Sequence, residues 1–423
     1  MTSITRALRS YLFTSWHTRR LQNVETFRAW QAQQLDHWLT HDVPKVDFYA
    51  AVPKSLDDLP IIDKTIVMND FAAFNTGRIT AEEGWEAFKG KARQDGVTIG
   101  ASTGTSGNRA LYAITDQERM DWLGSILAKA LPGFWYRRER VAIILPQNSA
   151  LYDGANQTRL MKLKFFDLHA GVETWADELD GFSPTTIVAP PRVLRHLAER
   201  ASSIRPKRMF AGGETLDPVD QHIIEAYFDR PLGQIYMATE GLFAVSCAHG
   251  KMHLTEDANY FEFEPVGEGL VSPIITSFRR SFQIMARYRM NDLLRLSADP
   301  CPCGSPLRAV DEVVGRMDDA FEFGDRLVTP DVMRNAVLDA AREITDFRLV
   351  RSDENTLELQ LPEDTSGAVA ALAQGALEGT LGARGLRPEI RVMRAPIAFS
   401  SDRKLRRVEN HWPRGENRPQ PSL

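Results

Sequence analysis

The sequence predicts an α/β protein with two folded units, and two observations carry this prediction. Between residues 141 and 237, short apolar segments alternate with amphipathic helical segments, which is typical of a largely parallel sheet. After Gly315 the pattern changes to the mixed strands and helices of a compact unit of about 100 residues, enough to form a separate domain. We therefore expect a large domain at 1–315, a small, mobile α+β lid domain at 316–412, and a disordered tail at 413–423.

The composition is that of an ordinary soluble globular protein, with 423 residues, 43% hydrophobic and 25% charged. The net charge of −5 argues against a dedicated nucleic-acid binder. No apolar run reaches the roughly 18–20 residues that span a bilayer, so we expect no transmembrane segment. Three cysteines give no disulfide framework, which favours a reducing, cytoplasmic location. A homodimer is left open.

The N-terminal 45 residues contain no glycine and carry apolar residues at helical spacing, so helices are expected there. Residues 1–24 combine arginines with apolar residues and have no acid, a pattern shared with targeting and membrane-surface helices. We interpret them as a first helix packed on the body. Asp63 is placed to cap a later helix, and β-prone segments at 96–99 and 110–114 predict a hairpin around a polar loop.

The remaining elements follow from the same patterns. A helix is expected at 116–131, strands at 141–145, 186–189, 208–211 and 233–237, and helices at 191–203 and 217–227. Residues 250–300 consist mostly of short strands and turns, which predicts a β-rich subdomain and mixed sheets in the large domain. The C-terminal unit is expected to contain helices at 330–343 and 367–382 and strands at 346–351, 356–361 and 389–393.

The polar loop combines hydroxyl side chains with glycines. Glycine permits close backbone approach to a ligand, and successive backbone N–H groups in a tight turn form a concave anion site. The alternative is a plain solvated loop. It is not the P-loop of kinases and GTPases, because Asn108 and Arg109 stand where that motif ends in Lys and Ser or Thr. Its candidate phosphate-binding residues are Ser102, Thr103, Gly104, Thr105, Ser106 and Gly107.

Acidic residues follow several predicted strands. Thr239 and Glu240 come at the end of one strand, where an acid suits Mg²⁺, which prefers one or two carboxylates plus phosphate oxygens; a helix cap is the alternative. Gly213 and Glu214 end another strand, and a glycine there lets a flat base lie against the backbone. Asp292 follows a β-like segment, where it can accept both hydroxyls of a ribose or form a surface salt bridge.

Two further features lie at and beyond the expected boundary between the domains. The segment from Gly315 to Asp319 contains Arg316 and the paired acids Asp318 and Asp319, and it reads as a hinge or as an ordinary linker. Lys404 belongs to a basic cluster, and such clusters are commonly solvated faces. On a mobile domain, this lysine would instead neutralise charge as a carboxylate attacks an α-phosphate.

Taken in their order along the chain, these motifs resemble those of the adenylate-forming superfamily of acyl-CoA synthetases and nonribosomal peptide adenylation domains. The order is a Ser/Thr/Gly loop, Gly-Gly-Glu, Tyr-x-x-Thr-Glu, Tyr-Arg-x-x-Asp, Gly-Arg-x-Asp-Asp and a C-terminal lysine. Phenylacetate–CoA ligases and coenzyme F390 synthetase-related proteins are the most similar group. They share the Leu-Pro-x-x-x-Lys segment, here Leu59 to Lys64, and the Cys-Pro-Cys-Gly element, here Cys301 to Gly304. The resemblance spans 59–408.

The resemblance implies a role for each motif. The loop from Ser102 to Gly107 would cradle the β- and γ-phosphates of ATP, and Lys404 would serve the adenylation half-reaction. The other implied roles are adenine binding by Gly213 and Glu214 with Tyr236 stacking nearby, α-phosphate contact by Thr239, Mg²⁺ binding by Glu240, ribose binding by Asp292 and Arg316, and a hinge at Asp318.

The implied activity is that of an acid–thiol ligase that uses ATP and Mg²⁺ to activate an aryl or acyl carboxylic acid. Pyrophosphate would be released, and the acyl group would pass to a thiol, with coenzyme A as the expected acceptor. A carrier protein or a protein cysteine is an alternative acceptor, and a non-catalytic nucleotide-binding homologue is a further alternative. Two departures bear on these choices: Asn108 and Arg109 replace the usual Lys-Pro after the loop, and Arg403 replaces the usual glycine before Lys404.

Two expectations remain. The acid pocket is placed near Phe210, Tyr236 and Phe243, with the helix after Pro191 as one wall. A structural zinc site is weighed against free reduced cysteines, because four Cys/His residues bracket the β-rich segment and zinc takes four such ligands. The Cys-x-Cys spacing is tighter than the common Cys-x₂-Cys. The four candidate ligands are Cys247, His253, Cys301 and Cys303.

Overall fold

The computed structural model describes residues 3–19, 23–49, 53–90, 96–102, 109–134, 137–145, 161–397 and 406–412. Three features expected from the sequence lie outside these ranges: the loop residues Thr103 to Gly107, Lys404, and the tail at 413–423. Within the described ranges, no helix combines the length and the apolar character that a membrane crossing requires.

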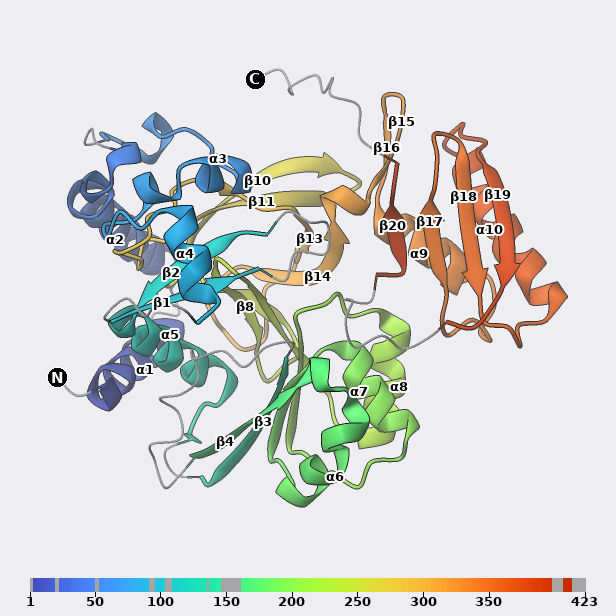
Figure 1. Cartoon of the computed structure of the whole chain (residues 1–423), viewed down its shortest axis with the longest axis horizontal. Coiled ribbons are helices and arrows are strands. Elements are labelled where there is room, and N and C mark those ends of the chain that lie inside the picture. Colours follow the sequence, from blue (N-terminus) through green and yellow to red (C-terminus); the bar gives the residue numbers. More distant parts are fainter. Residues whose placement is uncertain are drawn as a thin grey trace.

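A large mixed sheet runs through the body of the molecule (Figure 1). Its first half is parallel, in the order β4-β3-β5-β6-β7. These strands are β3 (Glu139–Leu145), β4 (Met161–Asp167), β5 (Thr186–Ala189), β6 (Arg208–Gly212) and β7 (Leu232–Ala238). Parallel strands bring their carboxyl ends to one edge of a sheet, where ligands bind in open α/β folds. The α/β prediction is confirmed.

The second half of the same sheet is antiparallel and forms the β-rich part that residues 250–300 predicted. Its order is β10-β11-β13-β14-β9-β8, with β12 paired to β11. The strands are β8 (Gly241–Ser246), β9 (Met252–Leu254), β10 (Tyr260–Gly267), β11 (Leu270–Thr276), β12 (Tyr288–Arg289), β13 (Asp292–Leu296) and β14 (Ala309–Arg316).

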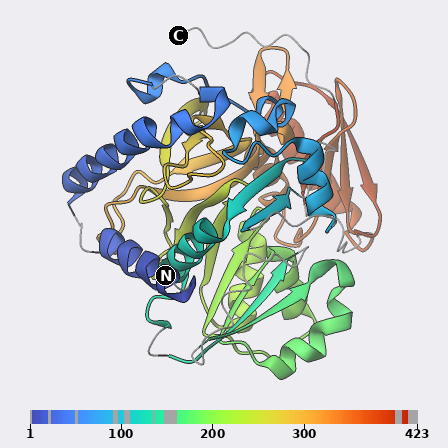
Figure 2. The same ribbon diagram turned by 60° about the vertical axis from the view of Figure 1, so that its left-hand side comes forward.

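Helices cover both faces of the parallel half, as the alternation of buried residues along the strands requires. Ala142 and Ile144 of β3 pack with α6 (Val172–Phe182), α7 (Pro191–Glu199) and α8 (Pro218–Phe228) on one face. Val141 and Ile143 pack on the other face with α5 (Asp116–Ala130). The first helix, α1 (Ser3–Arg19), lies along α5, which agrees with a helix packed on the body (Figure 2).

One predicted boundary in this layer is wrong. The helix expected to reach residue 203 ends at Glu199. Ala201 adopts a left-handed φ of 55°, and the backbone N–H of Ser202 donates to the carbonyl oxygen of Leu197 at 3.0 Å. Such a left-handed residue followed by a backward hydrogen bond closes a helix, and it here places the chain on course for β6.

The N-terminal part of the large unit packs against the antiparallel strands. It contains α2 (Val24–His41), α3 (Lys64–Asn69), α4 (Ala81–Phe88) and the hairpin of β1 (Val97–Ala101) and β2 (Leu111–Thr115). Asp63 caps α3 as predicted, since its carboxylate accepts from the backbone N–H of Ile66 at 2.9 Å. The hairpin holds the polar loop between its two strands.

The C-terminal unit has a sheet and a hydrophobic core of its own (Figure 1). Its elements are β15 (Phe321–Phe323), β16 (Arg326–Val328), α9 (Pro330–Leu338), β17 (Arg348–Arg351), β18 (Thr356–Leu361), α10 (Gly367–Gly382), β19 (Glu389–Arg394) and β20 (Val408–Asn410). The sheet order is β19-β18-β17-β20. The helix expected at 330–343 ends at Leu338, and the backbone N–H of Asp339 closes it by donating to Asn335 and Val337.

Candidate active site

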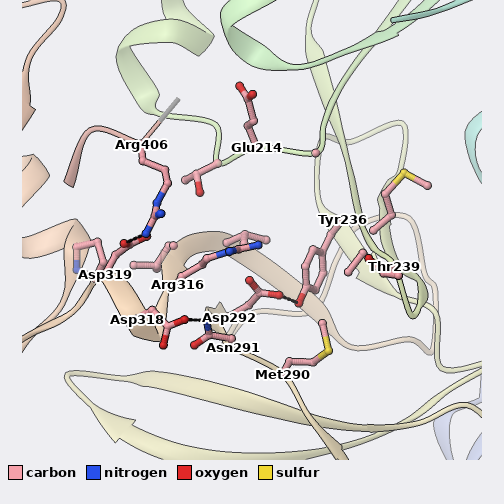
Figure 3. Close-up of a pocket in the computed structure, with 18 of the residues that line it drawn as sticks. Glu214, Tyr236, Thr239, Met290, Asn291, Asp292, Arg316, Asp318, Asp319 and Arg406 are labelled. Carbon is pink, nitrogen blue, oxygen red and sulfur yellow. Dashed lines mark hydrogen bonds and ion pairs between the residues drawn. The ribbon is translucent and has the colours of Figure 1, made fainter. Parts of the chain in front are cut away.

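A cavity of about 500 Å³ opens at the carboxyl ends of β6 and β7, between the large sheet and residues 406–408 of the C-terminal unit (Figure 3). The structure brings a set of the predicted site residues to its wall: Ser102, Gly213, Glu214, Tyr236, Thr239, Glu240, Asp292, Arg316 and Asp318. Phe210 and Phe243, which we expected at the acid pocket, are buried in hydrophobic cores and do not line this cavity.

Asp292 is held at the start of β13 by a tyrosine. The phenol hydroxyl of Tyr236 donates to the carboxylate oxygen of Asp292 at 2.6 Å, and both groups face the cavity (Figure 3). Burial, followed by the nearby negative charge of Asp292, raises the pKa of Tyr236 well above its usual value. The phenol therefore stays protonated and acts as a permanent hydrogen-bond donor to Asp292.

Glu240 is held in the same way by a second tyrosine. The phenol hydroxyl of Tyr288 donates to the carboxylate of Glu240 at 2.9 Å. Burial raises the pKa of Glu240, and the charge of Asp292 adds to that effect, while hydrogen bonds and the cation of Lys64 oppose it. Among the described residues, no ion pair of the Glu240 carboxylate is seen, so binding of a metal ion or another cation would stabilise its charge.

Lys64 is a cavity residue to which sequence reasoning assigned no role. The segment before it pairs with β12: the backbone N–H of Ile62 donates to Arg287 at 3.0 Å, and that of Arg289 donates to Ile62 at 2.8 Å. This pairing carries Lys64 to the cavity wall beside Glu240. Burial lowers the pKa of Lys64, whereas the charge of Glu240 raises it. The Leu-Pro-x-x-x-Lys pattern was the available signal, but spacing alone does not show where such a lysine points.

Gly213 and Glu214 meet the cavity through different groups. Gly213 has a left-handed φ of 81°, a conformation that favours glycine, and it exposes backbone at the cavity wall. The carboxylate of Glu214 forms a buried ion pair with Arg192 of α7 at 2.9 Å and points away from Asp292 (Figure 3). A flat base would therefore meet the backbone of this turn rather than the Glu214 carboxylate.

The described end of the phosphate-loop candidate closes the hairpin tightly. The backbone N–H of Ser102 donates to Ala110 at 2.7 Å, and the Ser102 hydroxyl accepts from the Ala110 N–H at 2.8 Å. Arg109 donates to the carbonyl oxygen of Ser102 at 3.1 Å and lies over the rings of Trp85 and Phe88. This guanidinium is directed to α4, and it does not line the cavity in place of the absent lysine.

The expected hinge segment lies beside the cavity and is tied to both units. The side-chain amide of Asn291 donates to Asp318, and Arg406 forms an ion pair with Asp319 (Figure 3). Residues 317–319 form a single 3₁₀ turn directly after β14. Arg316 extends along the cavity toward Asp292 and Tyr236 (Figure 3). A role as pivot stays a prediction.

The four candidate zinc ligands converge at the end of the antiparallel strands, and all their ligand atoms lie within 4.8 Å of one another. The Cys247 and Cys301 sulfurs are 3.7 Å apart, and the Cys303 sulfur is 3.2 Å from Nε2 of His253. Two sulfurs bound tetrahedrally at about 2.3 Å from zinc stand about 3.7 Å apart. Nδ1 of His253 faces the carbonyl oxygen of Leu307 at 3.0 Å, which leaves Nε2 for a metal. The residues present fit structural zinc.

In comparisons with known proteins, no protein-family model and no curated protein matches this chain. Solved structures do match. A 2-hydroxyisobutyryl-CoA ligase in the postadenylation state, in complex with 2-HIB-AMP, is similar with 20% identity and a TM-score of 0.67, covering 90% of this chain and 88% of that chain. The GH3.15 acyl acid amido synthetase is similar with 14% identity and a TM-score of 0.59, covering 89% and 87%. The fold is that of the adenylate-forming ligases, as the motif resemblance predicted.

The same 2-hydroxyisobutyryl-CoA ligase was also solved with 2-HIB-AMP and CoA in its thioesterification state. That structure matches at 18% identity with a TM-score of 0.54, over 90% of this chain and 88% of that chain. The coverage is equal, but the TM-score is lower than the 0.67 of the postadenylation state.

Proposed function

We propose that this protein is an ATP- and Mg²⁺-dependent ligase that activates an aryl or acyl carboxylic acid as an acyl-adenylate and transfers the acyl group to coenzyme A. One observation supports this proposal most directly. In a fold of this class, a single cavity contains two carboxylates, Glu240 and Asp292, and each accepts a hydrogen bond from a neutral tyrosine hydroxyl. Such carboxylates keep their negative charge available for a metal ion and for ribose hydroxyls.

Different residues of the cavity contact different parts of the nucleotide. Asp292 accepts the ribose hydroxyls with Arg316 alongside, and Glu240 holds Mg²⁺ with Thr239 at the α-phosphate. The turn at Gly213 lies against the adenine. Magnesium, when bound, neutralises charge on the phosphate oxygens.

The phosphates need positive charge, and of the cations that the chain offers we assign this role to two lysines. Lys64 lines the cavity beside Glu240, and we assign it the charge that the loop lacks after Gly107. Lys404 lies outside the described residues, and we assign it the role in adenylation that the motif resemblance implies. Because the attacking carboxylate is already a nucleophile, these cations act by positioning and charge stabilisation.

The proposed reaction has two balanced halves. First, a carboxylate oxygen attacks the α-phosphorus of ATP, the bond from that phosphorus to the bridging oxygen breaks, and pyrophosphate leaves with the electron pair. Then a thiol sulfur bonds to the acyl carbon, the bond from that carbon to the AMP oxygen breaks, and the thiol proton is released. Residues 315–319 are the proposed hinge between the two arrangements, with Asp318 as the pivot and 316–412 as the mobile domain.

The test is ATP–pyrophosphate exchange with a panel of aryl, hydroxy and fatty acids. Exchange with one class and AMP release with CoA are expected, and no exchange with any acid would contradict the proposal. AMP release that requires an acyl carrier protein would instead indicate the alternative acceptor. ATP binding without exchange would indicate a non-catalytic nucleotide-binding homologue, which the altered loop alone favours.

Variants of the two lysines sharpen this test. Lys404→Ala is expected to abolish exchange while sparing thioester formation from a supplied acyl-adenylate, because its charge serves only the first half-reaction. Lys64→Gln is expected to raise the KM for ATP about tenfold. Lys54→Gln, at an exposed position ten residues before Lys64 in the chain, is the control and should change neither exchange nor the KM for ATP. Equal losses in both half-reactions for Lys404→Ala would contradict its assigned role.

We also propose that the four-residue Cys/His cluster holds a structural zinc ion that takes no part in the chemistry. The geometry of Cys247, His253, Cys301 and Cys303 supports this. Elemental analysis of protein prepared without added metal is expected to give about one zinc per chain. Chelation should lower the melting temperature by several degrees. Zinc-free protein with an unchanged melting temperature would show that these are free thiols.

A further inference from the structure

A buried cluster of ion pairs joins the two units, and the proposed chemistry does not use it. Its centre is Arg407, the second residue of the described segment 406–412. Its partners are Asp217 and Asp220 at the start of α8 in the large unit, and Asp346 of its own unit. The side chains of Arg407, Asp217 and Asp220 are 3%, 8% and 0% exposed. We call Arg407, Asp217, Asp220, Arg195 and Arg334 the Arg407 cluster.

The geometry is that of a guanidinium held on two sides. Arg407 donates from Nη1 and Nη2 to the two carboxylate oxygens of Asp220, at 2.7 and 3.0 Å, and it also pairs with Asp217. Bidentate contact of this kind fixes orientation as well as distance. Burial tends to raise the pKa of Asp220, but the hydrogen bonds and charges of Arg407 and Arg195 together outweigh it and lower that pKa.

Two other arginines complete the same junction. Arg334 of α9, in the C-terminal unit, contacts Asp217 at 3.2 Å and Glu312 of β14 at 2.6 Å. Arg195 of α7 contacts Asp220 at 2.8 Å and donates to the carbonyl oxygen of Thr345 at 2.8 Å. Contacts therefore cross the junction in both directions, from arginines of each unit to oxygen atoms of the other.

Arg407 lies close to Lys404 in the chain and close to the cavity in space, so the cluster bears on the proposed reaction. Lys404, which lies outside the described residues, is three residues earlier in the chain. Arg407 itself lines the cavity. While Arg407 is docked on α8, the segment that begins at Arg406 is therefore held at the cavity. Rotation of the C-terminal unit away from α8 would have to separate Arg407 from both aspartates.

Resting on the function proposed above, we propose that Arg407 is a positioning residue for adenylation. Its pairing with Asp220 and Asp217 docks residues 406–408 of the C-terminal unit at the cavity, and its release is required before thioester formation. The Asp–Arg pairing thereby sets the balance between the two half-reactions. An exposed ion pair at the same junction, Arg384 with Glu268, contributes little to that balance, because solvent screens it.

The experiment measures both half-reactions in Asp220→Asn, with Arg407→Lys as a milder variant that keeps the charge but loses the bidentate contact. In Asp220→Asn, ATP–pyrophosphate exchange is expected to fall about tenfold or more, while thioester formation from a supplied acyl-adenylate and CoA changes less than about twofold. The exchange rate of Arg407→Lys should lie between those of Asp220→Asn and the wild type. Glu268→Gln is the matched control at the same junction and should behave as the wild type.

A purely structural cluster would give a different result: both half-reactions would fall by the same factor in both variants, which would overturn the proposal. Small-angle X-ray scattering provides an arm that does not depend on the chemistry. Asp220→Asn is expected to have a larger radius of gyration than the wild type. An unchanged radius would overturn the docking role even in an active enzyme, whereas an expanded variant supports it even if no acid gives exchange.

Discussion

The cavity and the junction between the units hold their carboxylates in opposite ways. In the cavity, Glu240 and Asp292 accept hydrogen bonds from tyrosine hydroxyls, and the pKa of Glu240 is raised, mainly by burial. At the junction, Asp220 is paired with two arginines, and its pKa is lowered despite its burial. Neutral donors orient a carboxylate without cancelling its charge, whereas guanidinium groups both orient and cancel it.

The difference suggests a rule for which carboxylates are free to bind a ligand. A carboxylate without a directly bound cation gains most when a metal ion or a hydroxyl pair arrives, and this is what the proposed roles of Glu240 and Asp292 require. A carboxylate already satisfied by arginine gains little from a ligand and instead resists separation from its partner. Breaking one contact of each kind tests this distinction.

The largest effect is expected from Glu240→Gln. Losing the charge that holds Mg²⁺ should reduce exchange about 100-fold or more. Because the folded-state pKa of Glu240 is raised, ionising this group opposes folding, and that penalty develops as the pH rises through the raised pKa. The variant should therefore melt about 1–2 °C higher than the wild type at neutral pH. Glu264→Gln, in an exposed pair with Arg289, is the control; a less stable Glu240→Gln would contradict the comparison.

An intermediate effect is expected from Tyr236→Phe. This change removes the donor that orients Asp292, so the KM for ATP should rise about tenfold while kcat changes little. Tyr288→Phe is the matched variant, because it removes the equivalent donor from Glu240. It should raise the Mg²⁺ concentration needed for half-maximal exchange and leave the KM for ATP at saturating Mg²⁺ nearly unchanged. If both variants moved the same parameter, the separate assignments of Asp292 and Glu240 would be wrong.

The smallest effect concerns acid stability. Asp220 faces Arg407, Arg195 and Asp346, and its pKa is lowered below the usual 3.8. A lowered folded-state pKa gives stability that is complete well above pH 3.8 and is lost as the pH falls through the folded value. The difference in unfolding free energy between the wild type and Asp220→Asn should therefore be constant from about pH 5 to 7 and shrink below about pH 4. Denaturant unfolding across this range measures it, and a difference that grows in acid would contradict the assigned charge state.

Much of the fold could be predicted from local patterns. The strands at 186–189 and 356–361 and the helix at 367–382 were predicted to the residue. Boundaries failed where closure depends on one backbone conformation, as at Ala201, which no pattern of apolar residues encodes. The hairpin around the polar loop was also predicted, because β-prone segments flanked a run rich in glycine and hydroxyl residues.

The site was predictable only where a motif names the residue. The sequence motifs singled out Thr239 and Glu240, which follow β7, and Asp292, which begins β13. All three residues line the cavity. Lys64 was part of a noted pattern, but its approach to Glu240 depends on the pairing of Ile62 with β12, across more than 200 residues of chain. Of the three aromatic residues expected near the acid pocket, Tyr236 lines the cavity, whereas Phe210 and Phe243 belong to hydrophobic cores, since aromatic residues at strand ends are often core.

The sequence by itself determined the alternation of strands and helices, the order of the motifs and the residue types at strand ends, because these depend on spacing along the chain. The tertiary structure alone decided which partner each carboxylate has. Spacing made Asp292 a candidate for a salt bridge or a ribose, and Tyr236, 56 residues away, turns it toward the cavity. Asp220 had no assigned role, and Arg407, 187 residues away, makes it part of the junction. Electrostatic partners depend on distances in space, which chain spacing does not encode.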